Sequence, residues 1–414
     1  MIQAQGDQSR AVFPLRAGNA LPAAEFAELR RTCALEQCKW DPQLGDQATL
    51  ASFPVFISET DWACLARSAE TLAAEADAAE RELLLRAPLL NQLGLPLALR
   101  QQFLRAGDVA ESPSFARVLR FDFHFTREGW RVSEVNSDVP GGFSEAEGFS
   151  SLMARCFSGH RVAGEPASSW ADRAALALDC EGEIALLSAP GYMEDAQVVA
   201  YLASFLRARG FKTHLVGPSG LRWKSGQAFL AAAREPLAGL FRFYQLEWLP
   251  ACKQAGWSHF LFGGATPVSN PGRAALSESK RFPLVWRDLR TRLPEFARLL
   301  PETRAPREVA RFLNDGWLLK GSYSNCGDAV ISRRWTSARS FRAAWARAVF
   351  APQGWVAQRE FDVVPLDTPL GALTHCLGVY VVDGRAAGAY LRLSPAQFVD
   401  SSAIDAALLI AEER

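Results

Sequence analysis

The chain has 414 residues, and its 45 Lys and Arg balance its 45 Asp and Glu, so the formal net charge is zero. This length predicts two or three lobes rather than one core. A chain without net charge is a poor general binder of nucleic acid or anionic membranes, so we expect neither as a partner.

The eight cysteines include no CxxC pair and accompany no histidine cluster, which argues against a zinc site and a disulfide framework. The first residues lack the apolar core of a secretory signal, and no run of about 18 apolar residues is long enough for a membrane span. We therefore expect a cytoplasmic protein with reduced thiols. Only six basic residues are lysines. Where Arg is the default cation, a Lys inside a motif points to a need for a compact, mobile ammonium.

The first two regions differ in their residue pattern. Residues 1–110 are predicted to be a mainly helical scaffold, because the stretch from Trp62 to Leu90 is rich in Ala, Leu and Glu. Residues 111–170 begin with strand-like alternation. They end in a stretch rich in Gly, Pro, Ala and Ser, from Gly159 to Trp170, which indicates a linker.

Residues 171–270 are predicted to form an α/β lobe. EIALLSAP, residues 183–190, is typical of a buried strand, and the next helix carries Glu194 and Asp195 in its first turn, where the helix dipole favours acids. Gly210 ends this helix before the return strand FKTHLVG. Strand, helix, strand implies a parallel pair, and no GxGxxG follows the first strand to indicate dinucleotide binding.

Residues 271–414 complete the chain. The apolar strand WLLK ends at Lys320 and precedes a glycine-containing loop, GSYSNCG. Further on, Asp383 and Gly384 separate two β-type runs, which is a good signal for a hairpin turn.

The strongest chemical pattern lies in residues 117–140. The first strand alternates an apolar face with a polar face that carries Arg120, Asp122 and His124. After a turn, the next strand places Glu134 and Asn136 on one face. The pattern therefore predicts a β-hairpin with chemistry on one side.

The turn decides how the two strands meet. We expect a three-residue turn ending at Gly129, because glycine favours the left-handed third position. That register pairs Asp122 with Glu134 and Arg120 with Asn136, and directly paired residues point to the same side. A turn of two or four residues would put the two carboxylates on opposite faces.

Two adjacent carboxylates repel each other, and a hard cation with oxygen ligands is the usual compensation. Asn136 would add a neutral oxygen, and Arg120 beside it would face a phosphate or a developing oxyanion. The alternative is a solvated polar face with an Arg–Asp ion pair. The pattern alone leaves both open.

The hairpin resembles the synthetase domain of glutathionylspermidine synthase, an ATP-grasp family. The resemblance rests on Arg-Phe-Asp, starting at Arg120, and on Glu-Val-Asn, starting 14 residues later at Glu134. It continues in order over about residues 115 to 410, through EDAQVVAYLASFLRARG, PVSNPGRAALSESKRFPLVW, WLLKGSYSNCGDAVI and GVYVVDGRAAGAYLRLS. It implies an α/β (α+β) class: an ATP-grasp-like fold with an N-terminal helical region and an inserted parallel α/β lobe.

The resemblance also implies a metal site and two catalytic arginines. Asp122, Glu134 and Asn136 match the residues that hold two magnesium ions, and Arg120 matches the arginine that faces the reacting phosphate. Arg392 would stabilise the acyl phosphate or the tetrahedral intermediate. The alternative for Arg392 is a salt-bridged strand arginine.

The nucleotide residues follow from the same resemblance. Lys320 would hold its ammonium over the α and β phosphates, and Lys280 would supply a second cation. The loop from Gly321 to Gly327 would close over the phosphates with backbone N–H groups, and Gln358 would contribute hinge or adenine contacts. The alternatives are an exposed strand-end lysine at 320 and a plain charged loop around 280. The chain has Lys-Gly and a Ser- and Asn-rich loop where the family has Lys-Pro and a loop arginine, so its grip on phosphate would differ.

We predict an ATP-dependent carboxylate–amine ligase that forms an amide through an acyl phosphate, using ATP and two Mg²⁺ ions. Its partners would be a small-molecule or peptide carboxylate and an amine, with polyamines among the candidates. The first alternative is a nucleotide-binding protein of the same fold that lacks ligase activity and acts as a partner module. The second is a metal-dependent hydrolase that uses Asp122 and Glu134 with His124.

Overall fold

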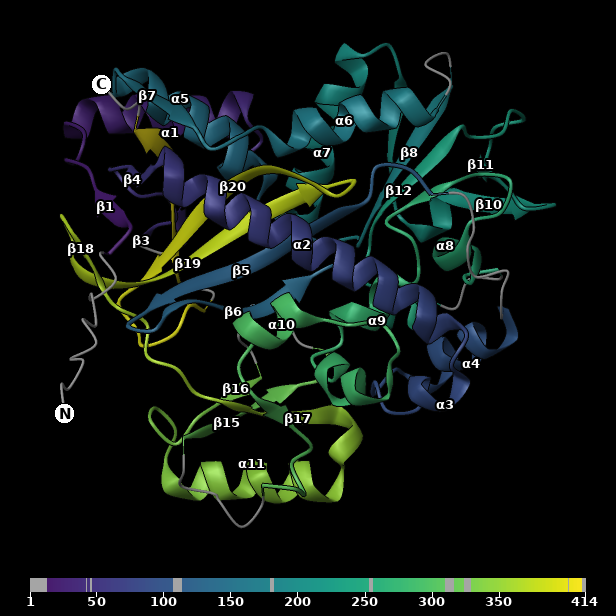
Figure 1. Ribbon diagram of the computed structural model, residues 1–414. Coiled ribbons are helices and arrows are strands. Elements are labelled where there is room, and N and C mark those ends of the chain that lie inside the picture. Colours follow the sequence, from purple (N-terminus) through teal and green to yellow (C-terminus); the bar gives the residue numbers. More distant parts are fainter. Residues whose placement is uncertain are drawn as a thin grey trace, which may run out of the picture.

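A six-stranded antiparallel sheet lies at the centre of the protein (Figure 1). The computed structural model describes residues 13–41, 43–44, 47–106, 114–178, 182–252, 256–309, 316–323, 329–400 and 402–411. The strand order is β21-β20-β19-β5-β6, and β18 pairs with β19. The strands are β5 (Val118–Thr126), β6 (Gly129–Asn136), β18 (Leu366–Thr368), β19 (Gly371–Val382), β20 (Arg385–Ser394) and β21 (Ile404–Ala406). The predicted hairpin, β5 and β6, therefore shares its sheet with strands from the C-terminal part of the chain.

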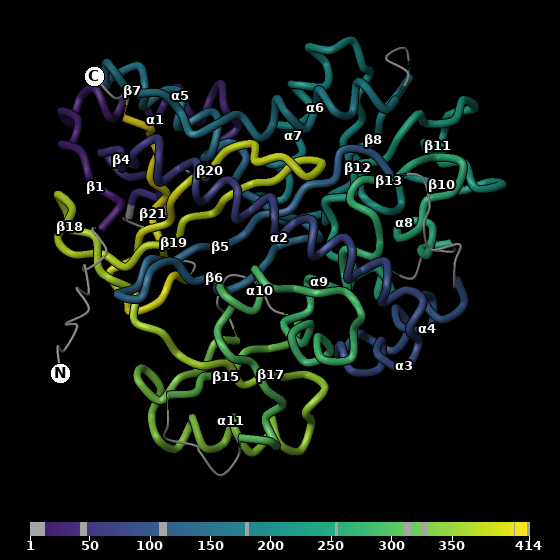
Figure 2. Tube along the Cα trace, viewed as in Figure 1, coloured from purple at the N-terminus to yellow at the C-terminus, as the bar shows by residue number. Residues whose placement is uncertain are grey.

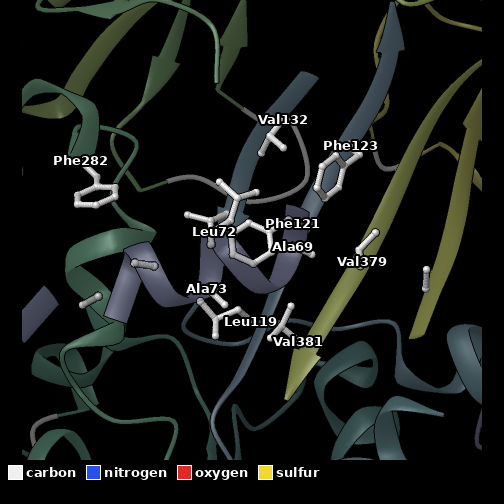
Figure 3. Packing of buried hydrophobic residues seen from close by; sticks show 14 of the residues in the cluster. Ala69, Leu72, Ala73, Leu119, Phe121, Phe123, Val132, Phe282, Val379 and Val381 are labelled. Carbon is white, nitrogen blue, oxygen red and sulfur yellow. The ribbon is translucent and has the colours of Figure 1, made fainter. Parts of the chain in front are cut away.

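Helix α2 (Glu59–Leu84) covers one face of this sheet (Figure 3). Leu72 of the helix belongs to the same buried cluster as Phe121 and Phe123 of β5, which are fully buried. Burying each such side chain stabilises the fold by about 1.5–3 kcal/mol. Because successive strand residues point to opposite faces, this packing directs Asp122 to the face away from α2.

The hairpin turn is shorter than predicted. Thr126 pairs with Gly129, which leaves two residues in the turn, so the expected three-residue turn is wrong. The register shifts between Asp122 and the residue after it, and the extra residue on β6 is Ser133, a β-bulge. One residue fewer in the turn and one more in the strand cancel. Asp122 therefore still pairs with Glu134, as predicted.

A second sheet is parallel throughout and confirms the predicted strand–helix–strand unit. Gly210, with φ +93°, follows the helix as expected. The sheet order is β13-β12-β8-β9. The elements are β8 (Glu183–Ser188), α7 (Met193–Ala208), β9 (Lys212–Val216), β12 (Gly239–Phe243) and β13 (Val268–Ser269).

The predicted linker between Gly159 and Trp170 is wrong. The segment contains strand β7 (His160–Val162) and the start of helix α6 (Pro166–Ala177). Proline is well tolerated at the first helical position, because a backbone N–H there would have no partner within the helix. The Glu147 carboxylate accepts hydrogen bonds from the first backbone N–H groups of α6. Composition alone does not reveal this remote cap.

A third lobe packs helix α11 (Ala338–Phe350) on a small antiparallel sheet of order β14-β17-β15-β16, and lies at the bottom of Figure 1. Its buried cluster includes Trp317, Leu319 and Trp345. The strands are β14 (Thr303–Arg304), β15 (Trp317–Gly321), β16 (Val330–Ile331) and β17 (Trp355–Arg359). The predicted strand that ends near Lys320 is therefore confirmed.

The two ends of the described chain meet in a fourth sheet, of order β1-β4-β22-β7 (Figure 2). Its remaining strands are β1 (Leu15–Ala17), β4 (Val55–Ser58) and β22 (Leu408–Ala411). The other helices are α1 (Ala23–Glu36), α3 (Ala87–Leu90), α4 (Leu97–Ala106), α5 (Ser150–Cys156), α8 (His259–Phe262), α9 (Ala274–Glu278) and α10 (Pro294–Leu299). Two small hairpins are β2 (Gln43–Leu44) with β3 (Gln47–Ala48) and β10 (Leu221–Lys224) with β11 (Gln227–Leu230).

Short helical turns complete the structure. A π-helical turn spans Ser144–Phe149, and 3₁₀ turns span Pro218–Gly220, Leu246–Cys252, Phe282–Asp288 and Pro352–Gly354. Within the described residues, every helix is too short or too polar to be a membrane span.

Candidate active site

The face of the central sheet that points away from α2 carries the charged residues of the hairpin, gathered around Asp122. Arg120 Nε donates to Asp122 Oδ1 at 2.8 Å, and Arg392 Nη2 donates to Oδ2 at 2.7 Å. Asn136 Nδ2 donates to the same Oδ2 at 3.2 Å. Burial raises the pKa of Asp122, but Arg120 and Arg392 outweigh it and hold this pKa well below its usual range. Asp122 is therefore a buried carboxylate that stays ionised.

A glycine on the neighbouring strand leaves room for the Arg120 side chain beside Asp122. Gly378 on β19 pairs with Asp122 on one side and with Tyr390 on the other. A Cβ at this position would lie 2.9 Å from Arg120 Cδ. The strand therefore needs glycine so that the arginine can lie across it. Sequence reasoning missed this residue, although an isolated glycine inside a strand-like run is its signal.

The second carboxylate faces two lysines. Lys280 Nζ lies 3.3 Å from Glu134 Oε2. Burial raises the pKa of Glu134, but Lys280, Lys320 and Arg392 together outweigh it and the pKa is lowered overall. Lys320 Nζ donates to the carbonyl oxygen of Ser133 at 3.0 Å, so the β-bulge presents an acceptor to this lysine. Burial lowers the pKa of Lys320 to about 8.

His124, which the metal-dependent hydrolase alternative would use, occupies a neighbouring position. Its Nε2 lies 3.0 Å from Ser133 Oγ, and its Nδ1 lies 2.9 Å from the carbonyl oxygen of His375. Burial lowers the pKa of His124 to about 4, so the ring is neutral near pH 7. Among the described residues, no three His, Cys, Asp or Glu side chains are grouped to hold a metal ion. This environment favours a structural histidine.

One cavity of about 340 Å³ lies where β15 and β17 face the central sheet. Its charged lining includes Lys280 and Lys320, and Gln358 lies in its wall. Gln358 Nε2 also donates to Thr303 Oγ1 at 3.1 Å. The apolar part of the wall is formed by Leu318, Val330, Trp335, Phe361, Val363 and Phe398.

Only part of the glycine-containing loop lies within the described residues. Gly321 ends β15, and its N–H donates to the carbonyl oxygen of Ala329 at 3.1 Å, so this N–H already has a partner. Gly327 lies outside the described residues. The expected backbone cradle for phosphate is therefore a prediction for that segment.

A second cavity of about 270 Å³ adjoins the first. Glu134 and Arg392 line both cavities, so the charged centre lies at their junction. Arg120 and Asn136 face only the second cavity. Carboxylates outnumber cations in its wall, and they include Asp41, Glu145, Asp195, Glu278, Asp400 and Asp405. The sequence analysis identified neither this cavity nor its excess of acids.

The model of one protein family, described as glutathionylspermidine synthase preATP-grasp, matches residues 55–405. The chain belongs to this family. The resemblance drawn from the hairpin and the later motifs is thereby confirmed, together with the α/β class and the ATP-grasp-type architecture of the family. A search of curated proteins gave no match.

Solved structures with similar folds are distant in sequence. A putative gamma-glutamylcysteine synthetase from Methylobacillus flagellatus is 10% identical, with a TM-score of 0.43 over 80% of this chain and 85% of that chain. D-alanyl-alanine synthetase A from Vibrio cholerae is 13% identical, with a TM-score of 0.35 over 54% of this chain and 73% of that chain. These two likenesses concern the fold alone.

Proposed function

We propose that this member of the glutathionylspermidine synthase preATP-grasp family is an ATP-dependent carboxylate–amine ligase. One observation carries the proposal: Glu134 and Arg392 line both cavities. A ligase of this kind must bring ATP and a second substrate to one point, where a phosphoryl group is transferred. Two cavities that meet at a carboxylate and an arginine meet this requirement.

The first cavity is the proposed ATP site. Lys280 and Lys320 line it together, and two ammonium groups suit a chain of phosphates. Its apolar wall suits a flat base, and Gln358 can hydrogen-bond to that base. The cavity of about 340 Å³ is within the usual range for small-molecule sites.

The hairpin fits magnesium by its donor chemistry. Asp122 and Glu134 are held as carboxylates by their neighbours, and Asn136 adds an amide oxygen, which together make an oxygen-only set. These three residues would hold the two ions. Bound there, magnesium would neutralise phosphate charge and polarise the γ-phosphoryl group.

The chemistry assigned to the protein is positioning and charge stabilisation. A substrate carboxylate oxygen attacks the γ-phosphorus of ATP, the bond to the bridging oxygen breaks, and ADP leaves. Arg120 and Arg392 stabilise the charge on the transferred phosphoryl group. A neutral amine then attacks the acyl carbon, phosphate leaves with the bonding electron pair, and the amine loses a proton to give the amide.

The second cavity is the proposed acceptor site. Its excess of carboxylates favours a cationic amine, and a polyamine carries further ammonium groups for the acids that lie away from Arg392. The carboxylate substrate would lie between this amine and Arg392. Peptide carboxylates, glutathione among them, are the first candidates.

ADP formation tests the proposal. We expect ADP release only when ATP, Mg²⁺, a carboxylate and an amine are all present, and glutathione with spermidine is the first pair to assay. ATP with Mg²⁺ should also protect the protein against heat, by about 2.7 kcal/mol at 100 times its Kd. Protection by ATP without ADP release from any of a broad panel of pairs would favour the partner module. The absence of protection would rule out both.

A further inference from the structure

Lys39 is a buried lysine beside the second cavity, and the proposed chemistry gives it no role. Its side chain is 4% exposed, and its ammonium nitrogen lies 2.6 Å from Glu145 Oε1, 3.1 Å from Asp41 Oδ1 and 3.3 Å from Asp405 Oδ2. Three carboxylates around one ammonium leave excess negative charge in a place where charge is costly. Removing Lys39 would leave these acids with no ammonium among them.

The three carboxylates come from segments that are distant in the sequence. Asp41 lies in the loop after α1, Glu145 lies in the π-helical turn, and Asp405 lies in β21. π-Helical turns occur frequently at functional sites. Lys39 and all three acids line the second cavity, so the cluster is part of its wall.

Asp405 stands between Lys39 and Arg392. Asp405 is the cross-strand partner of Arg392 in the β20–β21 ladder, and directly paired residues point to the same side of a sheet. Burial raises the pKa of Asp405 to about 7, and Lys39 and Arg392 both act against this shift. Asp405 therefore interacts with two cations.

Arg392 in turn lies between two carboxylates. Its Nη2 donates to Asp122 at 2.7 Å, and Asp405 is its neighbour on the other strand. The charges alternate along Lys39, Asp405, Arg392, Asp122 and Arg120. In such a row, the counter-ion of Asp405 affects the charge that Arg392 faces on its other side.

We propose that Lys39 is a positioning residue, which holds Asp405 and so keeps Arg392 directed at the junction of the two cavities. Without Lys39, the ionised form of Asp405 would have Arg392 as its main counter-ion. The guanidinium would be drawn along the sheet, away from Asp122. The importance of this shift for turnover rests on the proposed function, whereas the competition for Asp405 does not.

A double-mutant cycle in the absence of substrates tests the competition. We would measure the free energy of unfolding for the wild type, Lys39→Met, Arg392→Met and the double variant. Arg392→Met should cost more in the Lys39→Met background, because Arg392 is then the main counter-ion of Asp405. Additive effects would overturn the proposal. Lys212→Met, at an exposed lysine paired with Glu183, is the matched control and should be additive with Arg392→Met.

Recovery of turnover by a second substitution tests the consequence for catalysis. With glutathione and spermidine, Lys39→Met should lower kcat for ADP formation by roughly 10- to 100-fold, the usual effect of losing a group that orients site residues. The Kd for ATP should stay within about twofold, since Lys39 does not line the ATP cavity. Adding Asp405→Asn should restore most of the rate, because Arg392 then has no competing carboxylate beside it, and the loss in kcat with an unchanged Kd for ATP distinguishes this role from a merely structural one.

The outcomes separate the two proposals. If the wild type forms no ADP with any pair, the proposed function fails, while the unfolding cycle still decides the role of Lys39. If Lys39→Met does not fold, the variant with Asp405→Asn should be more stable, because it removes one of the three carboxylates that Lys39 held. A double variant that neither folds nor recovers activity would overturn the positioning role.

Discussion

The pKa of Lys320 permits a test that needs no acceptor substrate. Burial lowers this pKa to about 8, and the nearby charge of Lys280 also lowers it. The ammonium is therefore mostly protonated at neutral pH, but only about one tenth of it is protonated one unit above its pKa. If the ammonium binds the phosphates of ATP, the affinity must follow this titration.

ATP affinity should be constant below about pH 7 and fall roughly tenfold per pH unit above the pKa of Lys320, which is about 1.4 kcal/mol per unit. The fall should stop at the higher pKa that bound phosphates give the lysine. Lys320→Arg should remove the slope, because guanidinium does not titrate in this range. Lys320→Met should bind ATP weakly at every pH and show no slope.

Stability without ATP should move in the opposite direction. The folded-state pKa of Lys320, about 8, lies below the unfolded value of 10.5, so between these values the unfolded chain binds more protons. The cost of burying the ammonium is complete below the folded pKa. Stability relative to Lys320→Met should therefore rise with pH across this window.

Calorimetric titration with a non-hydrolysable ATP analogue and urea unfolding, each from about pH 7 to about pH 10, would measure both trends. An affinity that stays flat across this range in the wild type would refute the reasoning. The same slope in Lys320→Arg would assign the titration to another group.

Three further variants test the junction. Glu134→Gln should abolish ADP formation, because an amide lacks the charge that the cations require, and near-normal turnover would contradict its metal role. Arg392→Ala should lower kcat by roughly 10²–10³-fold with ATP affinity nearly unchanged, whereas an equal loss of affinity would make it a ground-state ligand. Gly378→Ala should displace Arg120 and cost about 1–3 kcal/mol of stability, while Gly354→Ala, with no neighbour within 4 Å, should be nearly neutral; equal effects would count against the close approach.

The two carboxylates lie on one face as predicted, but only because the bulge at Ser133 offsets a turn that is one residue shorter than expected. The alternation around Asp122 and the spacing to Glu134 depend on residues close in the sequence, and the structure confirms their pairing. The turn was predicted wrongly because a hairpin can accommodate an extra residue in the turn or in the strand. The bulge at Ser133 follows from contacts that the local sequence does not contain, including the one to Lys320.

Long-range order could not be predicted in the same way. Arg392 meets Asp122 across β19, which lies between their strands, and strand order is set by packing rather than by local pattern. The linker prediction failed for a similar reason. Trp170 is fully buried, and Glu147 caps the first turn of its helix, and neither contact is visible in composition.

The resting arrangement of Asp122 bears on how Arg392 could act. Arg120, Arg392 and Asn136 all donate to this carboxylate, and three of their hydrogen bonds reach Oδ2, so a divalent cation that binds Oδ2 would compete with them. Arg120 is also tied to the carbonyl oxygen of Gly141, and its side chain is 8% exposed. The side chain of Arg392 is 18% exposed and is the less restrained of the two arginines. Arg392 would therefore leave Asp122 first and face the transferred phosphoryl group. In the proposed mechanism Arg392 must therefore be able to move from Asp122 to the phosphoryl group, which is why Asp405 needs a counter-ion other than Arg392.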